Sequence, residues 1–133
     1  MSHHKLSENL QEADWKTEKH VPVIDCPDAV KRGDTFQVSV SVGREIPHPN
    51  TTEHHIRWIS LFFRADGEKA TYQVGHFEFT AHGESGQGPN AGPVYTAPSA
   101  TATVRMDKPG TLYALALCNI HGLWQAAKKI ETE

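Results

Sequence analysis

The chain has 133 residues, with 13 Lys and Arg against 16 Asp and Glu, so its net charge is -3 with the histidines neutral. This length is typical of one domain with its own apolar core. The small negative charge gives no reason to expect a nucleic acid or an anionic membrane as partner. No apolar run approaches the roughly 18 residues that a membrane span needs, and the N-terminus lacks the apolar stretch of a secretory signal. We therefore expect a soluble, cytoplasmic protein.

The first segment differs in composition from the rest. Residues 1–14 are polar and mixed in charge, which is typical of a lightly docked terminal arm. Trp15 is the first aromatic residue. We expect an arm over residues 1–14 and a single domain over residues 15–133.

Alternation of apolar and polar residues predicts several strands. In residues 36–42, Phe36 and three valines alternate with Gln37 and two serines, the period-2 pattern of a half-buried strand. Residues 21–24 read as extended chain because of their β-branching and a proline. Further strands are predicted over residues 56–63, 70–74 with 76–80 (bent at Gly75), 101–105 and 111–117.

The connections between these strands are rich in turn residues. Residues 83–98 hold four glycines and three prolines and are expected to form a long surface loop. Lys108, Pro109 and Gly110 predict a tight turn. No segment has a sustained helical period, so six to eight short strands predict an all-β sandwich or barrel.

Nine histidines in 133 residues are the compositional outlier, and they point to a metal site. Cys118 and His121 are spaced so that one turn can present sulfur and nitrogen to the same ion. His48 and His54 precede the strand predicted to begin at residue 56, where loops meet strand ends. A thiolate with several imidazoles suits iron, copper or zinc and argues against magnesium or calcium.

The residues alone leave alternatives open for this metal. A structural zinc site commonly uses two or more cysteines, and Cys26 lies in a poor context for the second. A blue-copper electron carrier uses two histidines and a cysteine, usually with a weak axial methionine, and residues 122–129 contain no methionine. An immunoglobulin-like binding module with a closed, structural metal is a third possibility.

Four blocks of sequence carry a resemblance to a known family. They are EKHVP at 18–22, HPNTTEHH at 48–55, TAHGE at 80–84 and CNIHGLW at 118–124. In this order they resemble the superoxide reductases of the one-iron class, the neelaredoxins, from about Trp15 to the C-terminus. The two-iron relatives carry an additional module with four cysteines, which this chain lacks.

The resemblance implies an immunoglobulin-like β-sandwich of about seven strands that holds one Fe(II)/Fe(III) ion per chain. It implies that superoxide is reduced by one electron to hydrogen peroxide without production of oxygen. The electron would come from an external donor such as rubredoxin, and the protein would be a homo-oligomer, either a tetramer or a dimer.

The same resemblance assigns residue roles by matching position. The equatorial iron ligands would be four histidines and the axial ligand a thiolate: His20, His48, His54, His121 and Cys118. Glu18 matches the carboxylate that occupies the sixth position in the oxidised form of many members. Lys19 matches the cationic residue beside the open position, where it would attract superoxide and help to supply a proton.

The remaining histidines and the second cysteine receive no ligand role. Strand alternation sends His55 to the face opposite His54, which favours a supporting role. We expect His76 on a strand surface, His82 as a hydrogen-bonding loop residue and Cys26 as a free thiol.

Overall fold

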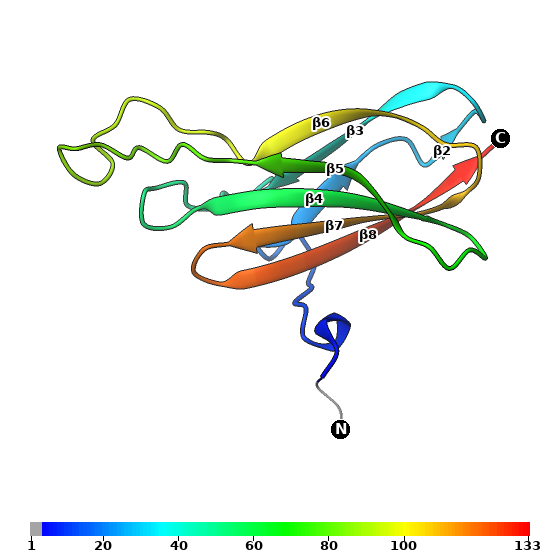
Figure 1. Ribbon diagram of the computed structural model, residues 1–133, viewed down its shortest axis with the longest axis horizontal. Coiled ribbons are helices and arrows are strands. Elements are labelled where there is room, and N and C mark those ends of the chain that lie inside the picture. The colour runs from blue at the N-terminus through cyan, green and yellow to red at the C-terminus, as the bar shows by residue number, and fades with distance from the viewer. Residues whose placement is uncertain (1–3) are drawn as a thin grey trace.

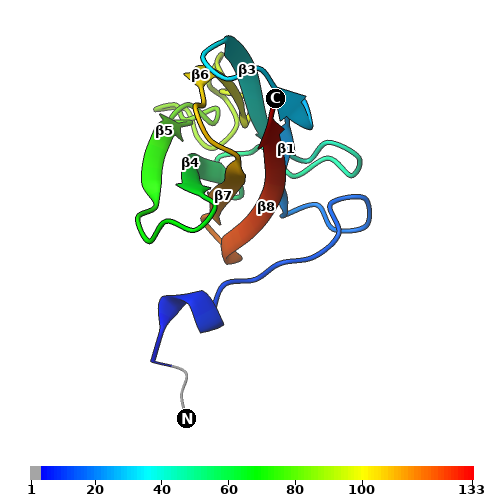
Figure 2. The same cartoon turned by 90° about the vertical axis from the view of Figure 1, so that its right-hand side faces the viewer.

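The computed structural model describes residues 4–133, and the start of the expected arm, residues 1–3, lies outside this range. Two sheets form a sandwich (Figures 1 and 2). The three-stranded sheet has the order β1-β3-β6 and the five-stranded sheet the order β2-β8-β7-β4-β5. The bounds of the strands are β1 Pro22–Asp25, β2 Ala29–Val30, β3 Thr35–Val42, β4 Ile56–Ala65, β5 Tyr72–Glu78, β6 Ser99–Arg105, β7 Gly110–Cys118 and β8 Gly122–Thr132.

The core lies between the two sheets, as the alternating pattern requires. On β7, Leu112, Ala114, Ala116 and Cys118 are at most 1% exposed, while the residues between them are half-buried on the other face. Val38 and Val40 of β3 and Ile59 of β4 are fully buried in the same cluster. The predicted all-β sandwich is therefore confirmed, and its two unequal sheets, antiparallel except for the short β2, agree with an immunoglobulin-like arrangement.

The predicted strands correspond to β1, β3, β4, β5, β6 and β7, with ends that differ by a few residues. β5 is irregular at the expected position: its pairing with β4 shifts in register between Leu61 and Phe62, next to Gly75. No strand was predicted after Cys118, but β8 begins at Gly122, directly after a short turn, and is the longest strand. The short β2, which pairs in parallel with the end of β8, was also missed.

One end of the sandwich gathers the connections that matter for function. The chain before β1, the β3–β4 loop, the β5–β6 loop and the β7–β8 turn all lie there, and the β5–β6 loop extends far beyond the sheets (Figure 1). The N-terminal segment has one turn of 3-10 helix, Leu6–Glu8, and then pairs with β8 through Gln11 and Trp124. Among the described residues there is no helix long and apolar enough to cross a membrane.

Candidate metal centre

A compact group of metal-binding side chains lies at this loop-bearing end. One ligand atom from each of His20, His54, Cys118 and His121 lies within 4.8 Å of all the others. The His48 ring adjoins them, with its centroid 5.0 Å from that of His20 and 4.8 Å from that of His54. The fold thus brings together four imidazoles and one thiol that are up to 101 residues apart in the chain.

The ring nitrogens of His48 and His54 are arranged as they would be around an ion. The Nδ1–H of His48 donates to the Pro49 carbonyl oxygen at 2.6 Å. The Nε2 atoms of both His48 and His54 are buried and have no hydrogen-bond partner among the described residues. Buried polar atoms are normally paired, and a ligating histidine typically donates its other N–H to a carbonyl or carboxylate. Both rings therefore fit metal ligation through Nε2.

Cys118 and His121 flank the turn from β7 to β8. The Cys118 sulfur is 3.8 Å from His121 Nδ1 and accepts the backbone N–H of His121 at 3.4 Å. His121 Nδ1 is also 3.0 Å from Nε2 of His20. These atoms identify Nδ1 as the nitrogen that His121 presents to the group and Nε2 as the nitrogen that His20 presents.

Burial favours the neutral form of two of the imidazoles, those of His48 and His54. It lowers the pKa of His48 from its usual 6.5 to about 4 and is the main cause of a lowered pKa at His54. Neighbouring histidines and the ammonium of Lys19 act in the same direction at both rings. Since the neutral imidazole is the form that binds metals, these lowered pKa values favour metal binding at His48 and His54.

Glu18 and Lys19 immediately precede His20 in the chain. One oxygen of Glu18, Oε1, accepts the ring Nδ1–H of His20 at 2.6 Å and its backbone N–H at 3.0 Å. The ring hydrogen bond is the main cause of the lowered pKa of Glu18. Nδ1 and Nε2 point in different directions from an imidazole, so this oxygen holds His20 from outside the group. Lys19 is half-buried, and its charge reaches the rings of His48 and His54.

Two supporting features were not found from the sequence. Trp124 stacks on His20 with centroids 5.0 Å apart and ring planes 13° apart. Gly43 has φ +91, and a Cβ there would lie 2.6 Å from the backbone N of His48. Neither Trp124 nor Gly43 received a role at the site from the sequence.

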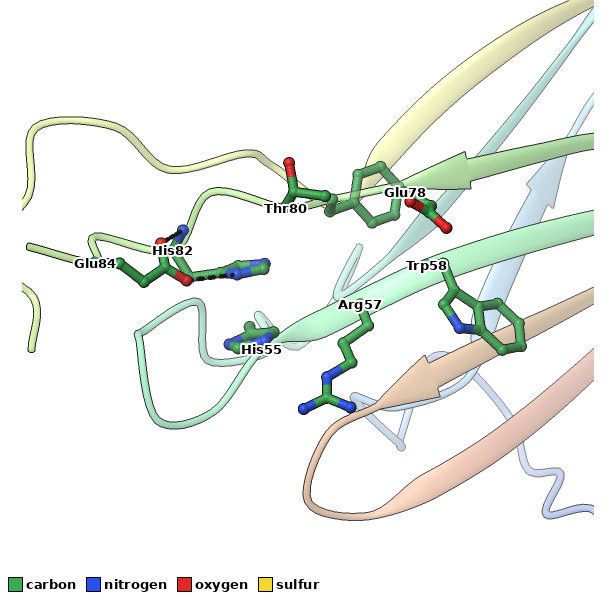
Figure 3. Close-up of a pocket in the computed structure, with 8 residues that line it drawn as sticks. His55, Arg57, Trp58, Glu78, Thr80, His82 and Glu84 are labelled. Atoms are coloured by element: carbon green, nitrogen blue, oxygen red, sulfur yellow. Dashed lines mark hydrogen bonds and ion pairs between the residues drawn. The ribbon is translucent and has the colours of Figure 1, made fainter.

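The other histidines lie apart from the metal-binding group. His55 and His82 stack face to face with centroids 3.4 Å apart, and both are buried. They form the inner wall of a pocket in which Glu84 contacts His82 (Figure 3). His76, on β5, contacts Ser60 and Glu78. Cys26 and Cys118 are both free thiols.

Comparison with known proteins gives a consistent result. The Desulfoferrodoxin family model matches residues 12–127. The chain is 56% identical to a neelaredoxin of Megalodesulfovibrio gigas over 126 residues, which cover 95% of this chain and 97% of that one. It is 55% identical to a superoxide reductase of Pyrococcus furiosus, covering 95% and 99% of the two chains. The solved structure of the superoxide reductase (neelaredoxin) of Archaeoglobus fulgidus in its reduced form has a TM-score of 0.85 and 52% identity, covering 92% of this chain and 98% of that one.

Proposed function

The chain belongs to the desulfoferrodoxin family, and from that premise we propose that it is a superoxide reductase. It reduces superoxide by one electron, with two protons, to hydrogen peroxide at a mononuclear non-haem iron centre. The observation that carries this proposal is the convergence of four imidazoles and one thiol on a single point, with two buried Nε2 atoms unpaired.

The proposed ligands of one iron per chain are the five side chains of this group: His20, His48, His54, His121 and Cys118. Imidazole and thiolate suit iron, which supplies reversible one-electron chemistry when it is bound. A blue-copper site needs two histidines and one cysteine, so the third and fourth imidazoles favour iron.

Lys19 is the proposed attractor of the superoxide anion. Its ammonium lies close enough to affect the rings of His48 and His54. The protein as a whole carries a net charge of -3, so a local positive charge is needed to draw an anion to this end of the sandwich. We also propose that Lys19 organises a proton for the product.

Glu18 has two proposed roles. Its contact with the Nδ1–H of His20 fixes the orientation of that ring and makes the ring a stronger ligand. We also propose Glu18 as an additional ligand of the oxidised metal. In that role the Glu18 carboxylate would have to release the Nδ1–H of His20 before it could bind the metal.

The reaction consumes one external electron per superoxide, and we propose a small one-electron donor such as rubredoxin. Ile120, at the tip of the β7–β8 turn, is 59% exposed, and His121 beside it is also exposed. Electrons can therefore enter over a short distance at this turn. The two free thiols support a reducing compartment, for which we propose the cytoplasm.

We also propose that the protein is a homo-oligomer, a dimer or tetramer. The solvent face of an antiparallel sheet is usually polar, and the outer face of β4, β7 and β8 instead presents large half-buried apolar side chains. The strand pairing places polar residues next to this face: Glu78, Gln125 and Lys129. An apolar centre with a polar rim is typical of a protein interface. The residues of the apolar face are Trp58, Phe62, Tyr113, Leu115, Leu117 and Leu123.

The test of the function is to load purified protein with iron and measure metal per chain, superoxide consumption and the products. We expect close to one iron per chain, and hydrogen peroxide without oxygen when a one-electron donor is supplied. Cys118→Ser is the matched control, because it removes the thiolate and little else. Stoichiometric binding of copper or zinc without iron uptake, or oxygen among the products, would contradict the proposal.

A further inference from the structure

Asn119 connects the two segments that carry the candidate ligands. Its side-chain Oδ1 accepts the backbone N–H of His55 at 2.9 Å, and its Nδ2 donates to the Glu53 carbonyl at 3.0 Å. Its own backbone N–H donates to the His55 carbonyl at 3.1 Å. Three hydrogen bonds therefore attach residues 53–55 to the turn that follows Cys118, and they bracket His54 on both sides.

The position of His54 depends on such contacts because its segment belongs to no strand. β4 begins only at Ile56, and the first pair of its ladder with β7 is Ile56 with Cys118. The next pair is Trp58 with Leu117, so the register shifts immediately beside the site. The sheet alone therefore leaves the last residues before β4 free to move relative to the Cys118 sulfur.

Asn119 also affects the donors around the sulfur. Its backbone N–H is committed to His55, while the N–H of His121 donates to the sulfur at 3.4 Å. A turn held at Asn119 by three bonds keeps the peptide before His121 in one orientation. Hydrogen bonds to a thiolate influence the reduction potential of the metal it binds.

Only an amide of this length can make both side-chain contacts. Asparagine offers an acceptor and a donor on one planar group, whereas an ionised aspartate can only accept. Glu53 presents a carbonyl that needs a donor and His55 presents an N–H that needs an acceptor. The local chemistry therefore selects asparagine at this position.

We propose that Asn119 is a positioning residue that sets the placement of the Cys118 thiolate relative to His54, and through it the strength of the iron–sulfur bond. This inference rests on the proposed iron site. It concerns a residue that is not among the proposed ligands.

Asn90 provides a matched control. Its Oδ1 accepts the N–H of Thr52 at 2.9 Å, and its Nδ2 donates to Glu53 Oε1 at 2.7 Å. It holds the same segment with two side-chain hydrogen bonds, but from the β5–β6 loop and without contact to the turn after Cys118. Because Asn90 has φ 60, glycine is the replacement that removes its side chain without backbone strain.

The experiment compares Asn119→Ala, Asn119→Asp and Asn90→Gly with the unmodified protein after iron loading. We measure the visible charge-transfer band from the thiolate to oxidised iron, the reduction potential and the rate of iron loss to a chelator. We expect Asn119→Ala to shift the band and the potential and to weaken iron affinity about 10- to 100-fold. Asn119→Asp should shift the band and the potential in the same direction. It loses the hydrogen bond to the Glu53 carbonyl, and its carboxylate would repel that carbonyl oxygen.

The control separates positioning from general loss of stability. Asn90→Gly should lower the stability to denaturant while leaving the band and the potential unchanged. An unshifted band and potential in both Asn119 variants would overturn the proposal, as would an equal shift in Asn90→Gly. If Asn119→Ala does not fold, Asn119→Asp still decides the question. The superoxide rate of the unmodified protein tests the proposed function separately.

Discussion

The indole of Trp124 lies flat on the imidazole of His20, with centroids 5.0 Å and ring planes 13° apart. Its Nε1–H also donates to the His121 carbonyl at 3.3 Å. One residue at the start of β8 therefore supports two candidate ligands from different loops. The residue before it, Leu123, accepts the backbone N–H of Gln11 through its carbonyl, so the N-terminal segment closes over the same strand.

Replacing Trp124 with alanine should weaken both the fold and the metal site. Loss of a buried tryptophan typically costs about 3–5 kcal/mol, and His20 would lose the surface that fixes its ring. Denaturant unfolding of the iron-free protein measures the first effect and chelator competition the second. Trp124→Phe keeps a flat ring and should retain most of the iron affinity. Unchanged iron affinity in Trp124→Ala would show that the stack has no role in the site.

Replacing Lys19 with alanine should slow the encounter with superoxide. Without the ammonium the second-order rate is expected to fall about 10-fold or more, and its dependence on ionic strength should weaken. Iron content should remain unchanged, since Lys19 is not among the candidate ligands. Pulse radiolysis or stopped flow gives the rate, and Lys19→Arg is the charge-preserving control. A rate equal to that of the unmodified protein would remove Lys19 from the mechanism.

Replacing Gly43 with alanine should displace His48. The Cβ would lie 2.6 Å from the backbone N of His48, and a positive φ costs a non-glycine residue about 1–2 kcal/mol. Gly33 has φ +85 with no atom within 4 Å of a Cβ, so Gly33→Ala carries the same backbone strain without the collision. We expect reduced iron affinity in Gly43→Ala alone. Equal iron affinity in the two variants would contradict this.

Among the strands that the sequence predicted, β3 has the clearest pattern, because one of its faces is buried and the other is polar. In β3 the alternation of valine with serine is uninterrupted, and the structure agrees within one residue. In β8 the central residues Ala126, Ala127, Lys128 and Lys129 are poor strand formers, so no such pattern marks them. That strand forms because Trp124 and Ile130 are buried near its two ends and β7 pairs with it from Gly122 to Ile130.

The residues of the candidate site differ in how far the sequence alone predicts their roles. The spacing of Cys118 and His121 indicates a metal by itself, because both side chains come from one turn. His20 offers no such local signal and could be found only through the resemblance of its block to a family. Asn119 and Trp124 act through contacts with residues more than 60 positions away. Contacts of that kind require the tertiary structure.

His82 predicts a specific dependence of stability on pH. Burial lowers its pKa below 6.5, and the neighbouring His55 ring adds to the effect. Between the lowered pKa and 6.5 the unfolded chain binds a proton at this residue and the folded protein does not. Its contribution to the free energy of unfolding is therefore fully present above pH 6.5 and is lost progressively as the pH falls below it.

His82→Phe keeps a flat ring against His55 and removes this titration. In iron-free protein between pH 5 and 7.5, the unfolding free energy of the variant should fall less steeply with acid. The difference in slope should be at most about 1.4 kcal/mol per pH unit, the value for one proton. Denaturant titrations of both proteins at a series of pH values give the two slopes. Parallel curves would show that His82 titrates normally in the folded state.

The outer face of the five-stranded sheet offers a test of the proposed homo-oligomer. Leu115 lies at its centre, between Ser60 of β4 and Gln125 of β8. An arginine there would place an unpaired charge in an apolar contact, which is costly to bury. We expect Leu115→Arg to convert the oligomer to monomers, measured by sedimentation or light scattering, while iron content is retained. Thr103→Arg, on an exposed position of β6 in the other sheet, should leave the assembly intact. Dissociation by Thr103→Arg and not by Leu115→Arg would place the interface on the three-stranded sheet.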